Sequence, residues 1–506
     1  MTTQQGTRQR RDERFDAGRT DRATFEVRSP GTGDVVGTYP VHTDDDVRDA
    51  VRRAREAAAW WADLGFAGRR ERLDAFRGIL ARRIQQLGGI VAEETGKPHS
   101  DAVLEVALVL DHLAWAAKHA EKVLGRRRVR SGMLTAHLAG EVEYKPLGVV
   151  GVIGPWNFPV FTPLGSIVFA LAAGNAVVFK PSEFSPGVGA WLVDAFAQVV
   201  PEQPVFQLVT GDGSTGAALC RSGVDKLAFT GSTATAKKVM ATCAETLTPI
   251  VAECGGKDAM IVDEDADLDA AVDGAVWAGL MNAGQACIGT ERVLVHERVH
   301  DAFLAKLTAK VSGLRAGADP EAKIGPITMP SQVEVIERHI ADALERGGRI
   351  AAGGGERDGQ VVQPHVLVDV PDDALANTEE TFGPTLTVGK VRSMEEAVAR
   401  ANATSYGLGA TVYGKRGREV ARRLRSGMVS VNAVFAAAQL ASVPFGGVGD
   451  SGFGRIHGPD GLREFTASQA VVRQRFKSAL PLTSFERTAK MEETLGKVVA
   501  IVHGRK

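Results

Sequence analysis

The chain has 506 residues, which suggests about three domains at roughly 150 residues each. Hydrophobic residues make up 44% and charged residues 24%, a balance that excludes wholesale disorder. The 60 Lys and Arg residues are matched by 61 Asp and Glu residues, which argues against nucleic acid as the main partner. The 57 glycines are about 11% of the chain, against roughly 7% in average usage. This excess indicates many tight turns and close backbone approaches.

The cysteines, the histidines and the N-terminus indicate the cellular compartment and whether a metal site is expected. Four cysteines without a CxxC pair do not form a disulfide framework and favour a reducing compartment. The histidines are scattered, with no HExxH motif, so we expect no metal site. Residues 1–24 mix Arg and Asp without the apolar stretch of a signal peptide and predict a flexible tail. The longest apolar run, Val168–Phe179, is too short to span a bilayer. We therefore expect a cytoplasmic protein that does not enter the membrane.

The segment after this tail has a helical pattern. Apolar residues recur at helical spacing over Val47–Trp61, Arg69–Leu87 and Leu104–Leu124. His112 and His119 lie seven residues apart on the last of these and share one face. Packing or solvent exposure is more common for such a pair than ligand binding, so we expect one of these two rather than a ligand site.

From Leu147 onward, short apolar runs alternate with helical segments. Such runs predict parallel βαβ units with both sheet faces covered. We expect strands at Val149–Ile153, Val177–Lys180, Val205–Thr210, Lys226–Thr230 and Ile250–Glu253, with helices at Gly187–Val200, Ser214–Arg221 and Ser232–Glu245. A second alternation predicts strands at Ala259–Val262 and Arg292–His296, and helices at Leu268–Met281 and His300–Leu314. We place a domain boundary between the two alternations, near Glu253.

Cys287 is the first residue that suggests chemistry. It follows Asn282-Ala-Gly-Gln-Ala, just past a helix that Gly284 is expected to terminate. A lone cysteine is usually a small buried hydrophobe. The flanking glycines and the position outside regular elements instead favour a thiolate that attacks a carbonyl. No histidine stands nearby in sequence, which leaves a Cys–His hydrolase unsupported but open.

Two polar residues follow expected strands. Glu253 ends one of them and precedes two glycines, so it points towards the usual ligand crevice of an open α/β sheet; a capped surface Glu is the alternative. Asn157 lies in Gly154-Pro-Trp-Asn-Phe-Pro159 and offers an amide donor for an oxyanion. A rigid turn is the more common explanation of that loop.

Two further strand ends suit a nucleotide. The Phe229–Ser232 turn joins a strand to a helix, and its N–H groups suit a phosphate, although it is not a GxGxxG fingerprint. Lys180-Pro-Ser-Glu183 follows a buried strand, and its Lys and Glu suit the hydroxyls of a ribose. An ordinary loop remains the alternative.

Together these motifs resemble the aldehyde dehydrogenase superfamily over about residues 25–475. The family's motifs occur here in order, as Pro155–Pro159 (PWNFP), Lys180–Glu183 (KPSE), Phe229–Ser232 (FTGS), Glu253–Lys257 (ECGGK), Gly284–Cys287 (GQAC), Glu380–Pro384 (ETFGP) and Pro444–Arg455 (PFGGVGDSGFGR). The final signature is similar to that of a branch containing bacterial semialdehyde dehydrogenases and fatty or aromatic aldehyde enzymes.

The resemblance implies roles for named residues. Cys287 would be the nucleophile, Glu253 the general base, and Asn157 an oxyanion donor together with the backbone N–H of Cys287. NAD would be the cofactor, with NADP possible, held by Trp156, Lys180, Glu183, Gly213, Gly231, Ser232, Glu380 and Phe382. The aldehyde pocket would be lined by Phe161, Gly165, Ala286, Ile288 and Phe435. Ser166 and Ala467 stand where many relatives have a Lys and a Glu that assist proton movement.

The resemblance also implies the fold class and assembly. We expect an α/β protein with a Rossmann-like cofactor domain, an α/β catalytic domain and a small β oligomerisation element that joins a homodimer or homotetramer. The implied division is residues 25–128 and 148–252 for the cofactor domain, 253–442 for the catalytic domain, 129–147 and 476–490 for the oligomerisation element, 443–475 for a return to the cofactor domain, and 491–506 for a C-terminal tail.

The substrate is less determined. The loop Val434–Val443 offers Phe435 and small residues but no cation, whereas the far carboxylate of a semialdehyde calls for an Arg. We therefore expect an apolar aliphatic or aromatic aldehyde, with succinate semialdehyde as the alternative. Transfer of the acyl group to coenzyme A is disfavoured by Glu253. A non-catalytic relative is disfavoured because both Cys287 and Glu253 are present.

Overall fold

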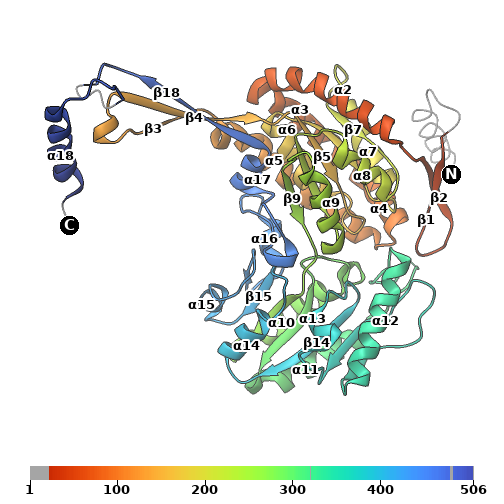
Figure 1. Ribbon diagram of the computed structural model, residues 1–506. Helices are drawn as coiled ribbons and strands as arrows, with labels where there is room; N and C mark the ends of the chain where they lie inside the picture. Colours follow the sequence, from red (N-terminus) through yellow and green to blue (C-terminus); the bar gives the residue numbers. More distant parts are fainter. Residues whose placement is uncertain (1–21, 320, 479–482, 505–506) are drawn as a thin grey trace.

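The computed structural model describes residues 22–319, 321–478 and 483–504. Most of the expected N-terminal tail, residues 1–21, lies outside this range. Two sheets with helices on their faces make up the body of the molecule, and a third, smaller sheet extends away from it (Figure 1). The expected α/β fold class is confirmed. No helix among the described residues is long and apolar enough to cross a membrane.

The first sheet has six strands in the order β17-β9-β8-β5-β6-β7, all parallel except β17. Its strands are β5 (Val149–Ile153), β6 (Ala176–Lys180), β7 (Phe206–Leu208), β8 (Lys226–Thr230), β9 (Ile250–Glu253) and β17 (Gly452–Phe453). The predicted strands β5, β8 and β9 are confirmed residue for residue. Since β5 to β9 are parallel, their carboxyl ends meet at one edge of the sheet, where ligands of open α/β sheets bind.

Helices from both ends of the chain cover this sheet. They are α2 (Asp44–Asp63), α3 (Gly65–Arg82), α4 (Ile84–Thr95), α5 (His99–Leu124), α6 (Phe161–Ala173), α7 (Pro186–Ala197), α8 (Gly213–Arg221), α9 (Thr233–Ala244) and α17 (Gly458–Glu464). The predicted helix Arg69–Leu87 is in fact two, because Arg83 leaves helical geometry while its guanidinium lies over the Trp191 ring. Helix α6 is buried along almost its whole length, which explains its nearly uninterrupted apolar sequence.

The second sheet has seven strands in the order β12-β13-β14-β11-β10-β15-β16, all parallel except β12. The strands are β10 (Asp258–Val262), β11 (Thr290–His296), β12 (Arg349–Gly353), β13 (His365–Val368), β14 (Thr385–Val391), β15 (Ala410–Tyr413) and β16 (Ser430–Val431). The helices are α10 (Leu268–Leu280), α11 (Glu297–Ser312), α12 (Pro330–Glu345), α13 (Leu375–Thr378), α14 (Met394–Ala401), α15 (Gly417–Ala421) and α16 (Ala436–Gln439). The chain passes from the first sheet to the second between β9 and β10.

Two smaller sheets complete the fold. A hairpin joins β1 (Thr24–Arg28) to β2 (Val35–Pro40), and β18 (Thr466–Gln474) pairs antiparallel with β4 (Leu138–Pro146), which pairs with β3 (Arg127–Val129). This β18-β4-β3 sheet stands apart from the body in Figure 1. Strand β18 of this sheet therefore lies before residues 476–490, the segment that was expected to form part of the oligomerisation element. The expected tail from residue 491 forms most of α18 (Ala489–His503), a helix without buried residues.

Candidate active site

Cys287 lies between α10 and β11, where the two main sheets approach each other. Helix α10 ends at Leu280, four residues earlier than Gly284, and the 3-10 helix η2 (Met281–Gly284) leads to the cysteine. The expected helix stop at Gly284 is therefore wrong. Gly284 has φ +72°, and a Cβ there would lie 1.9 Å from the carbonyl oxygen of Gly383. Only glycine fits this turn, which places Cys287 at the wall of a cavity.

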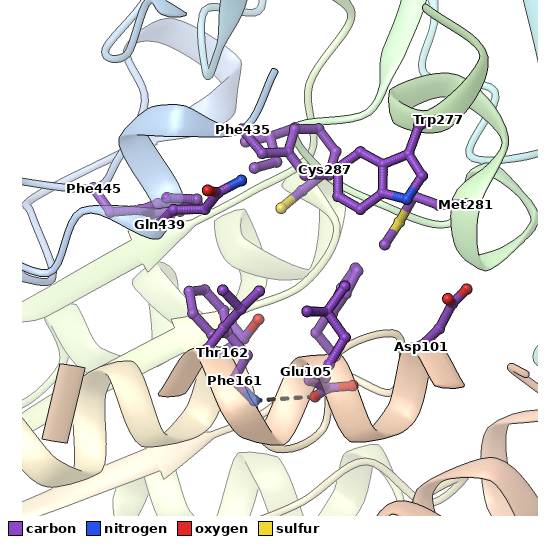
Figure 2. Close-up of a pocket in the computed structure, with 15 residues that line it drawn as sticks. Asp101, Glu105, Phe161, Thr162, Trp277, Met281, Cys287, Phe435, Gln439 and Phe445 are labelled. Atoms are coloured by element: carbon purple, nitrogen blue, oxygen red, sulfur yellow. Dashed lines mark hydrogen bonds between the residues drawn. The ribbon is translucent and has the colours of Figure 1, made fainter. Parts of the chain in front are cut away.

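The cavity at Cys287 has a volume of about 70 Å³ and a mainly apolar lining (Figure 2). It is lined by Asp101, Leu104, Glu105, Leu108, Phe158, Phe161, Thr162, Trp277, Met281, Cys287, Ile288, Phe435, Ala438, Gln439 and Phe445. No Lys, Arg or His is among these residues, all of which the structure describes. Burial, and after it the charge of Glu380, raises the pKa of the Cys287 thiol.

The five expected pocket residues do not all lie in this cavity. Phe161, Ile288 and Phe435 line it together with Cys287, whereas Gly165 and Ala286 do not. Gly165 instead faces His457, whose Nε2 would lie 2.6 Å from a Cβ at this position. Gly165 therefore permits close packing of α6 against His457.

His112 takes part in the same packing. Its ring is buried with its centroid 4.1 Å from that of His457, and its Nε2 donates to the carbonyl of Ala438 at 3.0 Å. Burial lowers the pKa of His112 to about 4. Of the two roles predicted for His112, packing is confirmed.

Asn157 is buried in the loop between β5 and α6. Its side-chain Nδ2 donates to the carbonyl of Gln285 at 3.0 Å, two residues before Cys287. An amide nitrogen carries two N–H groups, so one remains for a further acceptor. The hydrogen bond joins the Asn157 loop directly to the cysteine loop.

Glu253 is the last residue of β9 and is 3% exposed. Both carboxylate oxygens lack a hydrogen-bond partner among the described residues. Burial raises the pKa of Glu253 well above its usual range, Arg455 lowers it in part, and Glu464 raises it further. Burying a carboxylate without a hydrogen-bond donor costs free energy. Carboxylates with a strongly raised pKa cluster at functional sites, where they take up protons or bind a ligand.

The expected nucleotide residues lie at the carboxyl edge of the first sheet. The Lys180 ammonium, at the end of β6, is 3.6 Å from the Glu183 carboxylate, and burial lowers the pKa of Lys180. Ser232 caps α9 by accepting the N–H of Thr235. A Cβ at Gly213, the first residue of α8, would meet no atom within 4 Å. The backbone N–H of Gly231 donates to the carbonyl of Glu253 at 3.1 Å, which ties this turn to the general-base candidate.

Glu380 and Phe382 reach the same region from the second sheet. The Glu380 carboxylate accepts the backbone N–H of Gly256 at 2.9 Å, and burial raises its pKa to about 8. The Phe382 ring meets Trp156 edge to face at 5.5 Å between centroids. Open space at Gly213, a buried ammonium at Lys180 and a buried carboxylate at Glu380 fit the hydroxyl and phosphate groups of a dinucleotide.

Comparison with known proteins agrees with this geometry. The model of the aldehyde dehydrogenase family matches residues 17–471. The chain is 37% identical to 4,4'-diapolycopene aldehyde oxidase of Methylomonas sp, over 88% of this chain and 84% of that protein. It is 34% identical to glutarate-semialdehyde dehydrogenase of Pseudomonas aeruginosa, over 87% of this chain and 92% of that protein.

Solved structures agree with the sequence relatives. PnpE from Pseudomonas sp. WBC-3, also solved with nicotinamide adenine dinucleotide, superposes with a TM-score of 0.86 at 34% identity. That alignment covers 92% of this chain and 96% of PnpE. The chain belongs to the aldehyde dehydrogenase family.

Proposed function

We propose that this NAD-dependent aldehyde dehydrogenase oxidises an apolar aliphatic or aromatic aldehyde to its carboxylic acid through a thioester on Cys287. The observation that carries the substrate class is the lining of the cavity at Cys287, which is apolar and has no cation. The carboxylate of Asp101 also lies in that lining and would repel a substrate carboxylate, whereas the Glu105 carboxylate is paired with the Lys97 ammonium. A glutarate-semialdehyde dehydrogenase among the relatives keeps semialdehydes as the second candidate.

Cys287, Asn157 and Glu253 each have a separate role in the proposed reaction. The Cys287 thiol loses its proton to solvent as its sulfur bonds to the aldehyde carbon. The C=O π pair moves to the oxygen, and Asn157 with the Cys287 backbone N–H donates to the resulting oxyanion. Two such donors matter because losing one typically costs about 10²–10³ in rate. Lys180, Glu183 and Glu380 would hold a bound NAD, which would supply the hydride acceptor, and loss of hydride would convert the Cys287 adduct into a thioester. Glu253 then takes a proton from water, which attacks the thioester, releases the acid and returns the thiol.

The first test is an aldehyde panel with NAD. We expect kcat/KM for hexanal and benzaldehyde to exceed that for succinate and glutarate semialdehydes by about tenfold or more, since burying an unpaired carboxylate is costly. Phe435→Arg adds a cation to the cavity and should shift the ratio towards the semialdehydes, whereas Phe435→Gln serves as the neutral control. A wild-type preference for the semialdehydes would refute the apolar assignment. An acyl-CoA product would instead identify a transferase.

Cofactor preference depends on the Glu183 position. We propose that its carboxylate accepts both adenosine ribose hydroxyls of NAD while Lys180 supports it. NADP carries there a phosphate with a charge near −1.5 to −2, and like charges at about 4 Å cost roughly 1–4 kcal/mol. Glu183→Gln should therefore raise kcat/KM with NADP relative to NAD, and Glu245→Gln, an exposed control, should not. A wild type that prefers NADP tenfold would contradict this placement.

We propose further that the protein is a cytoplasmic homodimer or homotetramer joined through the β18-β4-β3 sheet. This sheet and the residues after it expose Val129, Val471, Val472 and Phe476, and exposed apolar patches of this kind mark association surfaces. The four cysteines are free, as expected in a reducing compartment. Light scattering of the purified protein measures the assembly.

A further inference from the structure

Lys97, in the turn between α4 and α5, has a fully buried side chain that the proposed chemistry does not use. Its ammonium donates to the Glu105 carboxylate at 2.6 Å and to the backbone carbonyl of Asn157 at 2.7 Å. It also lies 4.2 Å from the centroid of the Phe158 ring. Two of the three N–H donors of this ammonium are in hydrogen bonds, and the Phe158 ring lies within cation–π distance. Two of the three contacts are to the loop that carries Asn157.

Glu105 holds the other end of that loop. One carboxylate oxygen receives Lys97, and the second accepts the backbone N–H groups of Val160 and Phe161 at 2.7 and 3.0 Å. Figure 2 shows Glu105 on its helix reaching the backbone at Phe161. The first turn of a helix offers unpaired N–H groups, and a carboxylate is well suited to them. Lys97 and Glu105 together therefore fix the loop before and after Phe158.

The same loop is tied to the cysteine segment. Asn282 of η2 donates through Nδ2 to the carbonyl of Asn157 at 3.1 Å and to that of Gln285 at 3.2 Å. The Asn157 amide donates to the carbonyl of Gln285. Asn282 has φ +50°, a left-handed conformation that costs energy outside glycine. The Asn157 carbonyl thus accepts from both Lys97 and Asn282, one from each side of the site.

A fully buried ion pair is weak evidence for a role in stability, because well-packed apolar residues in its place often give an equal or higher free energy of unfolding. The pair instead fixes a position, since its other hydrogen bonds end on the Asn157 carbonyl and on the backbone N–H groups of Val160 and Phe161. We propose that Lys97 and Glu105 are positioning residues that hold the Asn157 side-chain amide where the oxyanion forms above Cys287. The inference rests on the proposed oxyanion role of Asn157.

The test is single-turnover NADH formation, which reports acylation alone. Lys97→Met should slow this step about tenfold or more, but less than Asn157→Ala, for which the loss of one donor costs about 10²–10³. NAD affinity should be unchanged. Because Lys97 acts through Asn157, the double variant should be no slower than Asn157→Ala, whereas independent roles multiply their effects.

Two further variants separate positioning from folding. Glu105→Gln retains an oxygen for the Val160 and Phe161 N–H groups, removes the charge pair, and should also slow acylation. Leu113→Ala lies on the same helix, is fully buried and should lower the melting temperature without slowing acylation. Multiplied effects in the double variant, or normal acylation in both Lys97→Met and Glu105→Gln, would overturn the inference. Normal acylation in Asn157→Ala would instead refute the proposed oxyanion role.

Discussion

Replacing Cys287 with alanine should abolish aldehyde oxidation while NAD binding persists. The proposed covalent bond forms at the Cys287 sulfur, and the other cavity walls carry no second thiol. The proposed cofactor residues Lys180, Glu183 and Glu380 are left intact. Steady-state NADH formation measures the first effect, and titration of NAD against intrinsic fluorescence measures the second. Turnover above a trace in Cys287→Ala would overturn the assignment of the nucleophile.

The other three cysteines are the matched controls. Cys220, Cys243 and Cys254 are buried, and none lines the cavity at Cys287. Burial raises the pKa of Cys254 to about 12, with Glu253 adding to the effect, so this thiol is protonated and unreactive at neutral pH. Each single alanine variant should keep substantial activity, and loss in Cys254→Ala alone would indicate that the neighbouring Glu253 needs that thiol for its packing.

Much of the fold followed from local pattern. Strands β5, β6, β8 and β9 are short, mainly apolar and buried runs. The end of β9 places Glu253, and the end of β6 places the Lys180 segment, at the ligand edge of the first sheet. The helix stop expected at Gly284 failed because α10 ends at Leu280 and a left-handed turn through Asn282 and Ala283 follows. Such turns are determined by tertiary contacts, so the hydrophobic periodicity of the sequence does not predict them.

The parts of the site that sequence missed depend on pairing across the fold. Lys97 contacts Asn157, which is 60 residues away, and Glu105 contacts Val160, which is 55 residues away. No sequence spacing predicts either contact. Gly165 lies one turn after Phe161 on the same face of α6, yet it does not line the cavity because the His457 ring packs directly against it. Buried polar contacts are decided by packing, whereas strand ends are decided by local sequence.

Glu253→Gln should separate the two half-reactions. Gln keeps the shape of the side chain but cannot accept a proton from water, so acylation should proceed once and deacylation should slow by about 10²–10⁴. We expect a burst of NADH equal to one turnover, followed by a slow steady state. Mass spectrometry of the variant after aldehyde and NAD should find the acyl group on Cys287. An unmodified Cys287 together with normal turnover would exclude Glu253 as the base.

The pH dependence tests the same role independently. Burial raises the pKa of Glu253 well above its usual range, and a general base acts only when ionised. The wild-type rate of deacylation should therefore increase as the pH rises through that raised pKa. At pH values below this pKa the carboxyl is protonated, and the rate should be lower. Glu253→Gln has no such group, so its slow deacylation should lose this step in the profile. The same step in wild type and variant would assign the titration to another group, with Glu380, whose pKa burial raises to about 8, as the next candidate.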